Sequence, residues 1–171
     1  LHLRHGGDRG LPQLDPQRSQ RDPDLGLRAS LAVRDCRVTG NRDVGIFVAG
    51  SDADVSHTLV EATTPREKDG LFGDGVVALA YGEPATMAVK ESLITGSGRA
   101  GLASFGSALS LASTRIACAA FELEADDYGG EEPALKDLGD NLCGCPEAES
   151  ECHAASSGLS PPDHDEASGG E

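Results

Sequence analysis

Large aromatic residues are almost absent from this sequence. It contains no tryptophan, and four phenylalanines and two tyrosines stand among 171 residues that include 22 glycines. Aromatic side chains supply much of the buried area in ordinary cores. A core made from this composition must use small aliphatic side chains in thin, regular layers, which favours a repetitive solenoid over a globule with a bulky centre.

Long apolar runs are also missing. No stretch approaches the roughly 18 apolar residues that a spanning helix needs, and none has the form of a signal peptide. The sequence therefore predicts no membrane span. It begins at Leu1 and not at methionine, so a processed or truncated piece of a longer chain is an alternative that stays open.

Basic residues are rare at the carboxyl-terminal end. The net charge is −15, and residues 121–171 hold one basic residue, Lys136, against fifteen acidic ones. Residues 30–120 are nearly balanced, with eight basic and ten acidic groups. Nucleic acid is excluded as a partner, because binding phosphates requires clustered basic side chains.

A repeat is the strongest signal in the chain. Residues 31–51 and 87–107 align without a gap at an offset of 56 residues, and seven positions are identical. Weaker copies start at Ala53 and Leu109, each 22 residues after the start of a strong copy. The period is therefore about 22 residues, broken once by a 12-residue insertion that we place at Thr64–Gly75.

Each copy predicts short strands bounded by turns. Alternating apolar residues come first, as in Leu31 and Val33, and a second apolar segment follows a glycine, as in residues 45–48, 75–78 and 101–104. One copy then forms one turn of a solenoid. We predict that four side chains stack in one internal column: Val33, Val55, Val89 and Leu111.

The units VRDCRVTGNRDVGIFV and VKESLITGSGRAGLAS resemble right-handed parallel β-helix repeats of the pectate-lyase-like superfamily, of a bacterial type. The resemblance implies an all-β, right-handed parallel β-helix solenoid of about four coils over residues 27–125. It implies no single activity, because that superfamily includes lyases, hydrolases, epimerases and adhesins. Residues 1–26 are predicted to be irregular, and residues 126–171 to be an acidic, cysteine-containing, mostly disordered tail.

His57 is the leading candidate for chemistry. The 22-residue register places Asp35, His57, Glu91 and Ser113 at equivalent outward positions on successive coils, about 4.8 Å apart. A histidine between two carboxylates can act as a general base or bind a cation. The alternative is a solvated row of alternating charges. The acidic calcium-ligand cluster that the likeness to polysaccharide lyases implies maps onto no set of positions here.

Two other segments allow a functional or a plain structural interpretation. The insertion could present a contact patch of charged residues and Phe72, or be a surface loop. Residues 96–101 match G-x-G-x-x-G, which binds dinucleotides when a helix follows. The equivalent residues 40–45 have Arg42 at the middle glycine, so a repeated turn explains both copies and the nucleotide site explains one.

The five cysteines fall into two groups. Cys36 shares a position with Thr58, Ser92 and Thr114 and is predicted to be a small buried thiol. The remaining four are disulfide candidates, with Cys118 joined to Cys143 or Cys145, so that the tail folds back over the end of the solenoid. A zinc site formed by Cys143, Cys145, Cys152 and His153 is the alternative, at a spacing unusual for zinc.

These observations favour a non-enzymatic, extracytoplasmic β-helix scaffold. We expect it to act at the extracellular or cell surface, or in the periplasm, with a carbohydrate or protein surface as partner and without a cofactor or metal. The alternative is the carboxyl-terminal part of a carbohydrate-active enzyme, a polysaccharide lyase or glycoside hydrolase, whose catalytic coils lie upstream. On that alternative His57, Asp35 and Glu91 are the candidate catalytic residues.

Overall fold

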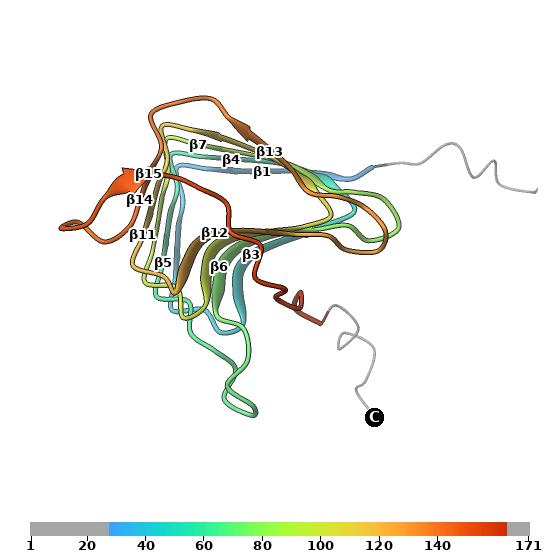
Figure 1. Cartoon of the computed structure of the whole chain (residues 1–171), viewed down its shortest axis with the longest axis horizontal. Coiled ribbons are helices and arrows are strands. Elements are labelled where there is room, and N and C mark those ends of the chain that lie inside the picture. The colour runs from blue at the N-terminus through green and yellow to red at the C-terminus, as the bar shows by residue number, and fades with distance from the viewer. Residues whose placement is uncertain (1–27, 164–171) are drawn as a thin grey trace, which may run out of the picture.

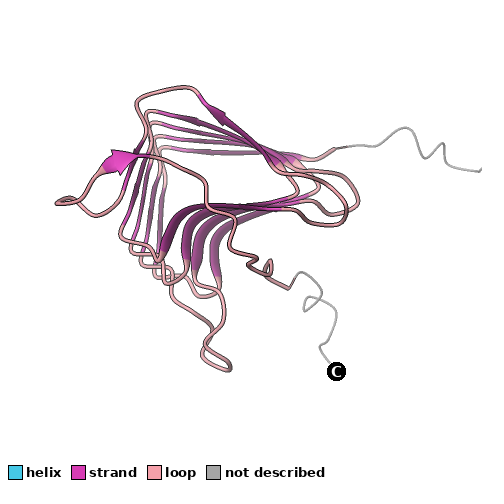
Figure 2. Ribbon diagram, viewed as in Figure 1, coloured by secondary structure: helices cyan, strands magenta, loops and turns pink. Residues whose placement is uncertain are grey.

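The computed structural model describes residues 28–163 as one parallel β-solenoid of about four turns (Figures 1 and 2). Within these residues the chain forms fifteen strands and no helix, so no helix there could span a membrane. The irregular segment expected over residues 1–26 lies outside the described residues, as do residues 164–171.

Each of the first four coils contributes one strand to each of three sheets, which form the sides of a triangular cross-section (Figure 1). The first sheet holds β1 (Ser30–Arg34), β4 (Asp52–Ser56), β7 (Thr86–Lys90), β10 (Ala108–Ala112) and β13 (Ala134–Asp137). The second holds β2 (Arg37–Thr39), β5 (Leu59–Glu61), β8 (Leu93–Thr95), β11 (Arg115–Ala117), β14 (Leu142–Cys143) and β15 (Ser150–Glu151). The third holds β3 (Val44–Ala49), β6 (Asp74–Leu79), β9 (Ala100–Phe105) and β12 (Phe121–Asp126).

The predicted internal column is present. Val33 pairs with Val55, Val55 with Val89, and Val89 with Leu111 in the parallel register of the first sheet. The last three of these side chains are at most 1% exposed. Matching columns come from the other two sheets, and all three meet in one core of small aliphatic side chains. The sequence repeat is therefore the repeat of this core.

A glycine stands near the start of each of the first three strands of the third sheet, because the chain bends there against buried side chains of the second sheet. A Cβ atom added at Gly75 would lie 2.6 Å from Ile94 Cγ2 and 2.6 Å from the carbonyl oxygen of Gly101. Real Cβ atoms do not approach other atoms so closely, so a side chain at Gly75 would displace the next coil. This contact accounts for the repeated glycine at positions 45, 75 and 101.

The 12 extra residues of the broken repeat enter at two places, not one. The connection from β5 to β6 has 12 residues (62–73), where the equivalent connection 40–43 has four. The connection from β6 to β7 has six residues (80–85), where residues 50–51 suffice in the preceding coil. Asp74 and Gly75 belong to β6, so the predicted insertion is corrected at its carboxyl-terminal end.

The solenoid also extends past the predicted boundary at residue 125. Strand β13 pairs with β10, and β14 pairs with β11, both in parallel. Residues 126–163 therefore complete a further coil and a cap, and the prediction of a mostly disordered tail is wrong for them. Asp137 follows Leu111 in the internal column and accepts hydrogen bonds from Gly139 N and Asn141 Nδ2. This inward carboxylate ends the apolar column, a common way to protect a free sheet edge.

Two disulfides fasten the cap, as the sequence predicted. Cys118 is joined to Cys145 and Cys143 to Cys152, which removes the three thiols that the zinc alternative required. After the antiparallel β14–β15 pair the chain crosses the end of the last coil toward β12 (Figure 1). There Ala155 forms a parallel bridge with Glu124.

Candidate binding groove

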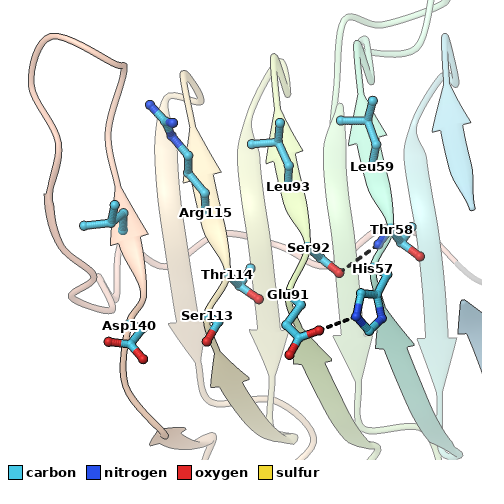
Figure 3. Close-up of a pocket in the computed structure, with 11 residues that line it drawn as sticks. His57, Thr58, Leu59, Glu91, Ser92, Leu93, Ser113, Thr114, Arg115 and Asp140 are labelled. Atoms are coloured by element: carbon cyan, nitrogen blue, oxygen red, sulfur yellow. Dashed lines mark hydrogen bonds and ion pairs between the residues drawn. The ribbon is translucent and has the colours of Figure 1, made fainter. Parts of the chain in front are cut away.

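A groove of about 660 Å³ runs over the outer face of the second sheet, near its corner with the first sheet. Figure 3 shows its side chains rising from successive coils in three parallel rows. The groove includes two of the three candidate catalytic residues, His57 and Glu91. The third candidate, Asp35, lies one coil earlier and is not among the described residues that line it.

The first row follows the corner between the first and second sheets. Asp35, His57, Glu91 and Ser113 all have φ between 47° and 52°, and Asp140 continues the row with φ 60°. The amide nitrogen of His57 donates to the carbonyl of Lys90, and that of Glu91 donates to the carbonyl of Ala112. Each coil thus turns the corner in the left-handed region, where histidine and aspartate are enriched among non-glycine residues.

His57 Nε2 contacts Glu91 Oε2 on the next coil (Figure 3), and the contact is an ion pair when the imidazole is protonated. The predicted stacking of these two positions is confirmed. Their side chains are 59% and 57% exposed, so water competes with the contact. An exposed ion pair contributes little to folding, and the imidazole and carboxylate remain accessible for hydrogen bonds to a ligand.

The second row is a set of small polar side chains that lie below the first. The hydroxyl of Ser92 donates to the carbonyl of Lys90 at 2.7 Å and accepts from the amide nitrogen of Thr58 at 3.1 Å. The amide nitrogen of Thr114 donates to Asn141 Oδ1 at 2.9 Å. These side chains are buried, and their hydrogen bonds fix the floor of the groove.

Cys36 takes the same position in the first described coil. The prediction that its thiol is buried is wrong. Its thiol donates to the carbonyl of Arg34 at 3.0 Å, as the equivalent hydroxyls do to their own neighbours, but the side chain is exposed. Thr58 and Ser92 have described coils on both sides, whereas Cys36 has one on a single side. Position along the solenoid, not residue type, sets its burial.

The third row is apolar and was not found from the sequence. Leu59, Leu93, Arg115 and Leu142 are aligned in the register of β5, β8, β11 and β14. Leu93 is 36% exposed and Leu142 is 43% exposed. Arg115 interrupts the leucines and forms an ion pair with Glu149. A strip of exposed apolar surface therefore runs parallel to the His57–Glu91 row.

Two members of the contact patch predicted for the insertion, Phe72 and Asp74, are buried, whereas residues 67–69 are exposed. Phe72 is 7% exposed, and the guanidinium carbon atoms of Arg66 and Arg99 lie 4.4 Å and 4.8 Å from its ring centre. Arg99 also holds the buried carboxylate of Asp74, and Arg66 forms an ion pair with Asp69 at 3.0 Å. These contacts fasten residues 62–73 against the solenoid.

The dinucleotide alternative is contradicted by the backbone. Residues 96–101 form the turn into strand β9 rather than the start of a helix. Gly96 and its repeat equivalent Gly40 have φ of 65° and 67°. The repeated glycines are therefore turn residues.

The three rows belong to one groove because equivalent positions on successive coils point the same way. The arrangement offers hydrogen-bonding groups on one side and leucine side chains on the other. No protein-family model matches the chain, and neither does any curated protein or solved structure.

Proposed function

We propose that this chain is a non-enzymatic, extracytoplasmic binding scaffold whose groove over the second sheet holds an extended carbohydrate chain. The observation that carries the proposal is the groove itself, which repeats the same polar and apolar rows coil after coil. A polymer with a short repeat can contact such a surface several times over, because coils recur about every 4.8 Å.

The side chains of the groove suit an uncharged ligand. Glu91 and Asp140 line it, and Arg115, the one arginine among the described residues of the lining, is already paired with Glu149. A polyanion would meet repulsion from the two carboxylates. A neutral sugar chain would place hydroxyl groups against the His57–Glu91 row and its apolar face against Leu93.

The two disulfides and the sense of the coil complete the proposal. Disulfides persist in oxidising compartments, which supports an extracellular, cell-surface or periplasmic location. Parallel strands joined by crossovers are right-handed in almost all known cases. We therefore assign the coil the right-handed sense of the pectate-lyase-like superfamily, together with the bacterial origin that the sequence resemblance implies.

A second function has one observation in its favour. The His57–Glu91 pair has the composition of a general-base dyad, as expected if the chain were the carboxyl-terminal part of a carbohydrate-active enzyme. Both side chains are more than half exposed, whereas catalytic acids and bases are commonly desolvated to adjust their proton affinity. The exposure favours ligand contact over proton transfer.

Binding of neutral oligosaccharides tests the proposal. Titrating cello-, xylo- and manno-oligosaccharides into the protein should shift the amide signals of residues 57–59, 91–93 and 113–115 in NMR spectra. Replacing Leu93 with aspartate should weaken the tightest of these complexes at least about tenfold, or about 1.4 kcal/mol, because it puts a charge in the apolar row. His57→Ala should weaken it by a smaller factor.

The matched control is Leu71→Asp. Leu71 is an exposed leucine, 51%, in the inserted loop and outside the groove. That variant should bind as the unmodified protein does. Amide shifts confined to residues outside the groove, or an equal loss of affinity in both variants, would show that the groove is not the binding site. Release of unsaturated sugars from a polyuronate, abolished by His57→Ala or Asp35→Ala, would establish the enzyme instead.

A further inference from the structure

Two carboxylates are buried together on the outer face of the third sheet. Glu124 and Asp126 stand two residues apart on β12, so their side chains lie on the same side of the strand. Glu124 is 0% exposed and Asp126 is 6% exposed. Burying two neighbouring acidic side chains is costly unless each is hydrogen-bonded or neutralised. The groups that hydrogen-bond to them therefore indicate what the pair does.

Their partners belong to the polar, small-residue segment at 156–159, which follows the Cys143–Cys152 disulfide. Glu124 Oε1 accepts from the amide nitrogen and the hydroxyl of Ser157, at 2.6 and 2.7 Å. Asp126 Oδ1 accepts from the hydroxyl of Ser156 at 2.7 Å, and Oδ2 accepts from the amide nitrogen of Leu159 at 2.9 Å. The carboxylates thus hold the backbone of the segment as a bound peptide would be held.

One oxygen of this cluster accepts no hydrogen bond from the described residues. Glu124 Oε2 is fully buried and has no partner there, and the carboxyl group of Asp126 beside it is the group that a proton on Glu124 would reach. Burial raises the pKa of Glu124, and the negative charge of Asp126 raises it further. A protonated Glu124 donates to Asp126 and removes the repulsion between two buried charges.

Asp126 responds in the opposite direction. Burial acts to raise its pKa, but hydrogen bonds from Ser156, from Glu124 and from the amide nitrogens of Gly158 and Leu159 outweigh burial and leave the pKa below its ordinary value. Because the two pKa values are shifted in opposite directions, the pair loses its protons in two steps, Asp126 first, and the singly protonated pair is the state between them.

No cation neutralises the pair within residues 28–163. Across the third sheet, β9 presents Ala103 and Phe105 beside the two acids, and the segment at 156–159 is uncharged. Arg99 is close to the segment and donates to the carbonyl of Ser160 at 2.9 Å, but its guanidinium is committed to Asp74. The proton is thus the partner that keeps two buried acids compatible.

We propose that Glu124 and Asp126 form a proton-dependent latch that holds residues 155–160 on the third sheet and releases them when the shared proton is lost. With one proton present, every carboxyl oxygen has a donor or is a donor. Loss of that proton leaves two like charges buried side by side, and the segment must move so that water can reach them. Gain of a second proton removes the charge that the amide nitrogens of Gly158 and Leu159 require.

Opening the latch uncovers apolar surface. Leu159 packs against an outer cluster of buried side chains that includes Leu79 and Phe105. The Cys143–Cys152 disulfide fixes the beginning of the segment, so an opened segment stays tethered beside the surface it leaves. The latch therefore regulates access to this apolar face and leaves the core columns in place.

Hydrogen exchange of the segment as a function of pH tests the latch. Protection of the amide groups of Ser157, Gly158 and Leu159, corrected for the intrinsic rate, is measured from about pH 5 to about pH 9. In the unmodified protein we expect it to fall at least tenfold toward alkaline pH. The amide groups of core strands such as β9 should stay protected throughout, which separates latch opening from unfolding.

Glu124→Gln is the decisive variant. Its side-chain amide accepts from Ser157 and donates to Asp126 without ever carrying a charge, so protection of the segment should persist to alkaline pH. Asp126→Asn should lose protection at every pH, because a neutral oxygen binds the amide nitrogens more weakly. Glu132→Gln, at an exposed position on the same coil, should behave as the unmodified protein.

Two results would overturn the latch. Protection that stays constant across the pH range in the unmodified protein would show that no proton controls the segment. Alkaline loss of protection that persists equally in Glu124→Gln would assign the change to another group. Binding of a hydrophobic dye in parallel reports whether the outer cluster is uncovered, and neither measurement depends on a ligand in the groove.

Discussion

Replacing Leu111 with alanine is expected to lower the free energy of unfolding by about 2–5 kcal/mol. Leu111 is 1% exposed and lies in the internal column between Val89 and Asp137. Truncation removes buried methyl groups and leaves a cavity that neighbouring coils cannot close, because their backbones are fixed by strand pairing on both sides. Urea denaturation at an unchanged m-value measures the loss.

Leu135→Ala is the matched control for this prediction. It belongs to the same sheet one coil further on and is 39% exposed. Its removal should cost less than about 1 kcal/mol, because much of its surface is already in water. Leu135 pairs with Leu109 at the open end of a neighbouring column, so equal losses in the two variants would mean that burial between two coils does not set the size of the loss.

The sequence predicted the solenoid because its strongest constraints repeat. Gly75 and Gly101 are required where the chain bends against the neighbouring coil, and Val55, Val89 and Leu111 are required inside. Each constraint acts at the same position of every coil, so it appears as a period of about 22 residues. A fold whose contacts join adjacent repeats is readable from a single sequence for this reason.

The last coil could not be predicted in the same way. Its connection over residues 127–133 has seven residues where residues 106–107 suffice one coil earlier. Its inward position is filled by Asp137 rather than an aliphatic residue. These departures end the solenoid, and they erase the repeat that identified the other coils. With no repeat to follow, the acidic composition of this part of the chain predicted disorder, although two disulfides hold it in place.

The functional residues also fall into a group that the repeat predicted and a group that it did not. The pairing of His57 with Glu91 followed from the register, since both occupy one repeat position. The buried pair of Glu124 and Asp126 did not, because its partners come from Ser156–Leu159, which belong to no repeat. Contacts between coils are encoded by periodicity, whereas contacts between a coil and its cap depend on the path of the chain.

Removing the disulfide between Cys118 and Cys145, by replacing both with serine, is expected to cost about 3–4 kcal/mol of unfolding free energy. The bond closes a loop with a sequence separation of 27 residues, and the loss of that closure gives the unfolded chain more freedom. For a chain of this size the expected fall in Tm is about 7–14 °C, which thermal unfolding followed by circular dichroism measures.

The exposed thiol Cys36 supplies the control, since Cys36→Ser removes a sulfur without removing a cross-link and should leave Tm within about 2 °C.

The second disulfide, Cys143–Cys152, closes a separation of nine residues and should contribute less, about 2.6 kcal/mol. Because it anchors the segment that crosses the last coil, its removal should also reduce amide protection at residues 155–160 while strands β4 to β9 keep theirs. A Tm unchanged by loss of the Cys118–Cys145 bond would show that the last coil is held by strand pairing alone, through β10–β13 and β11–β14.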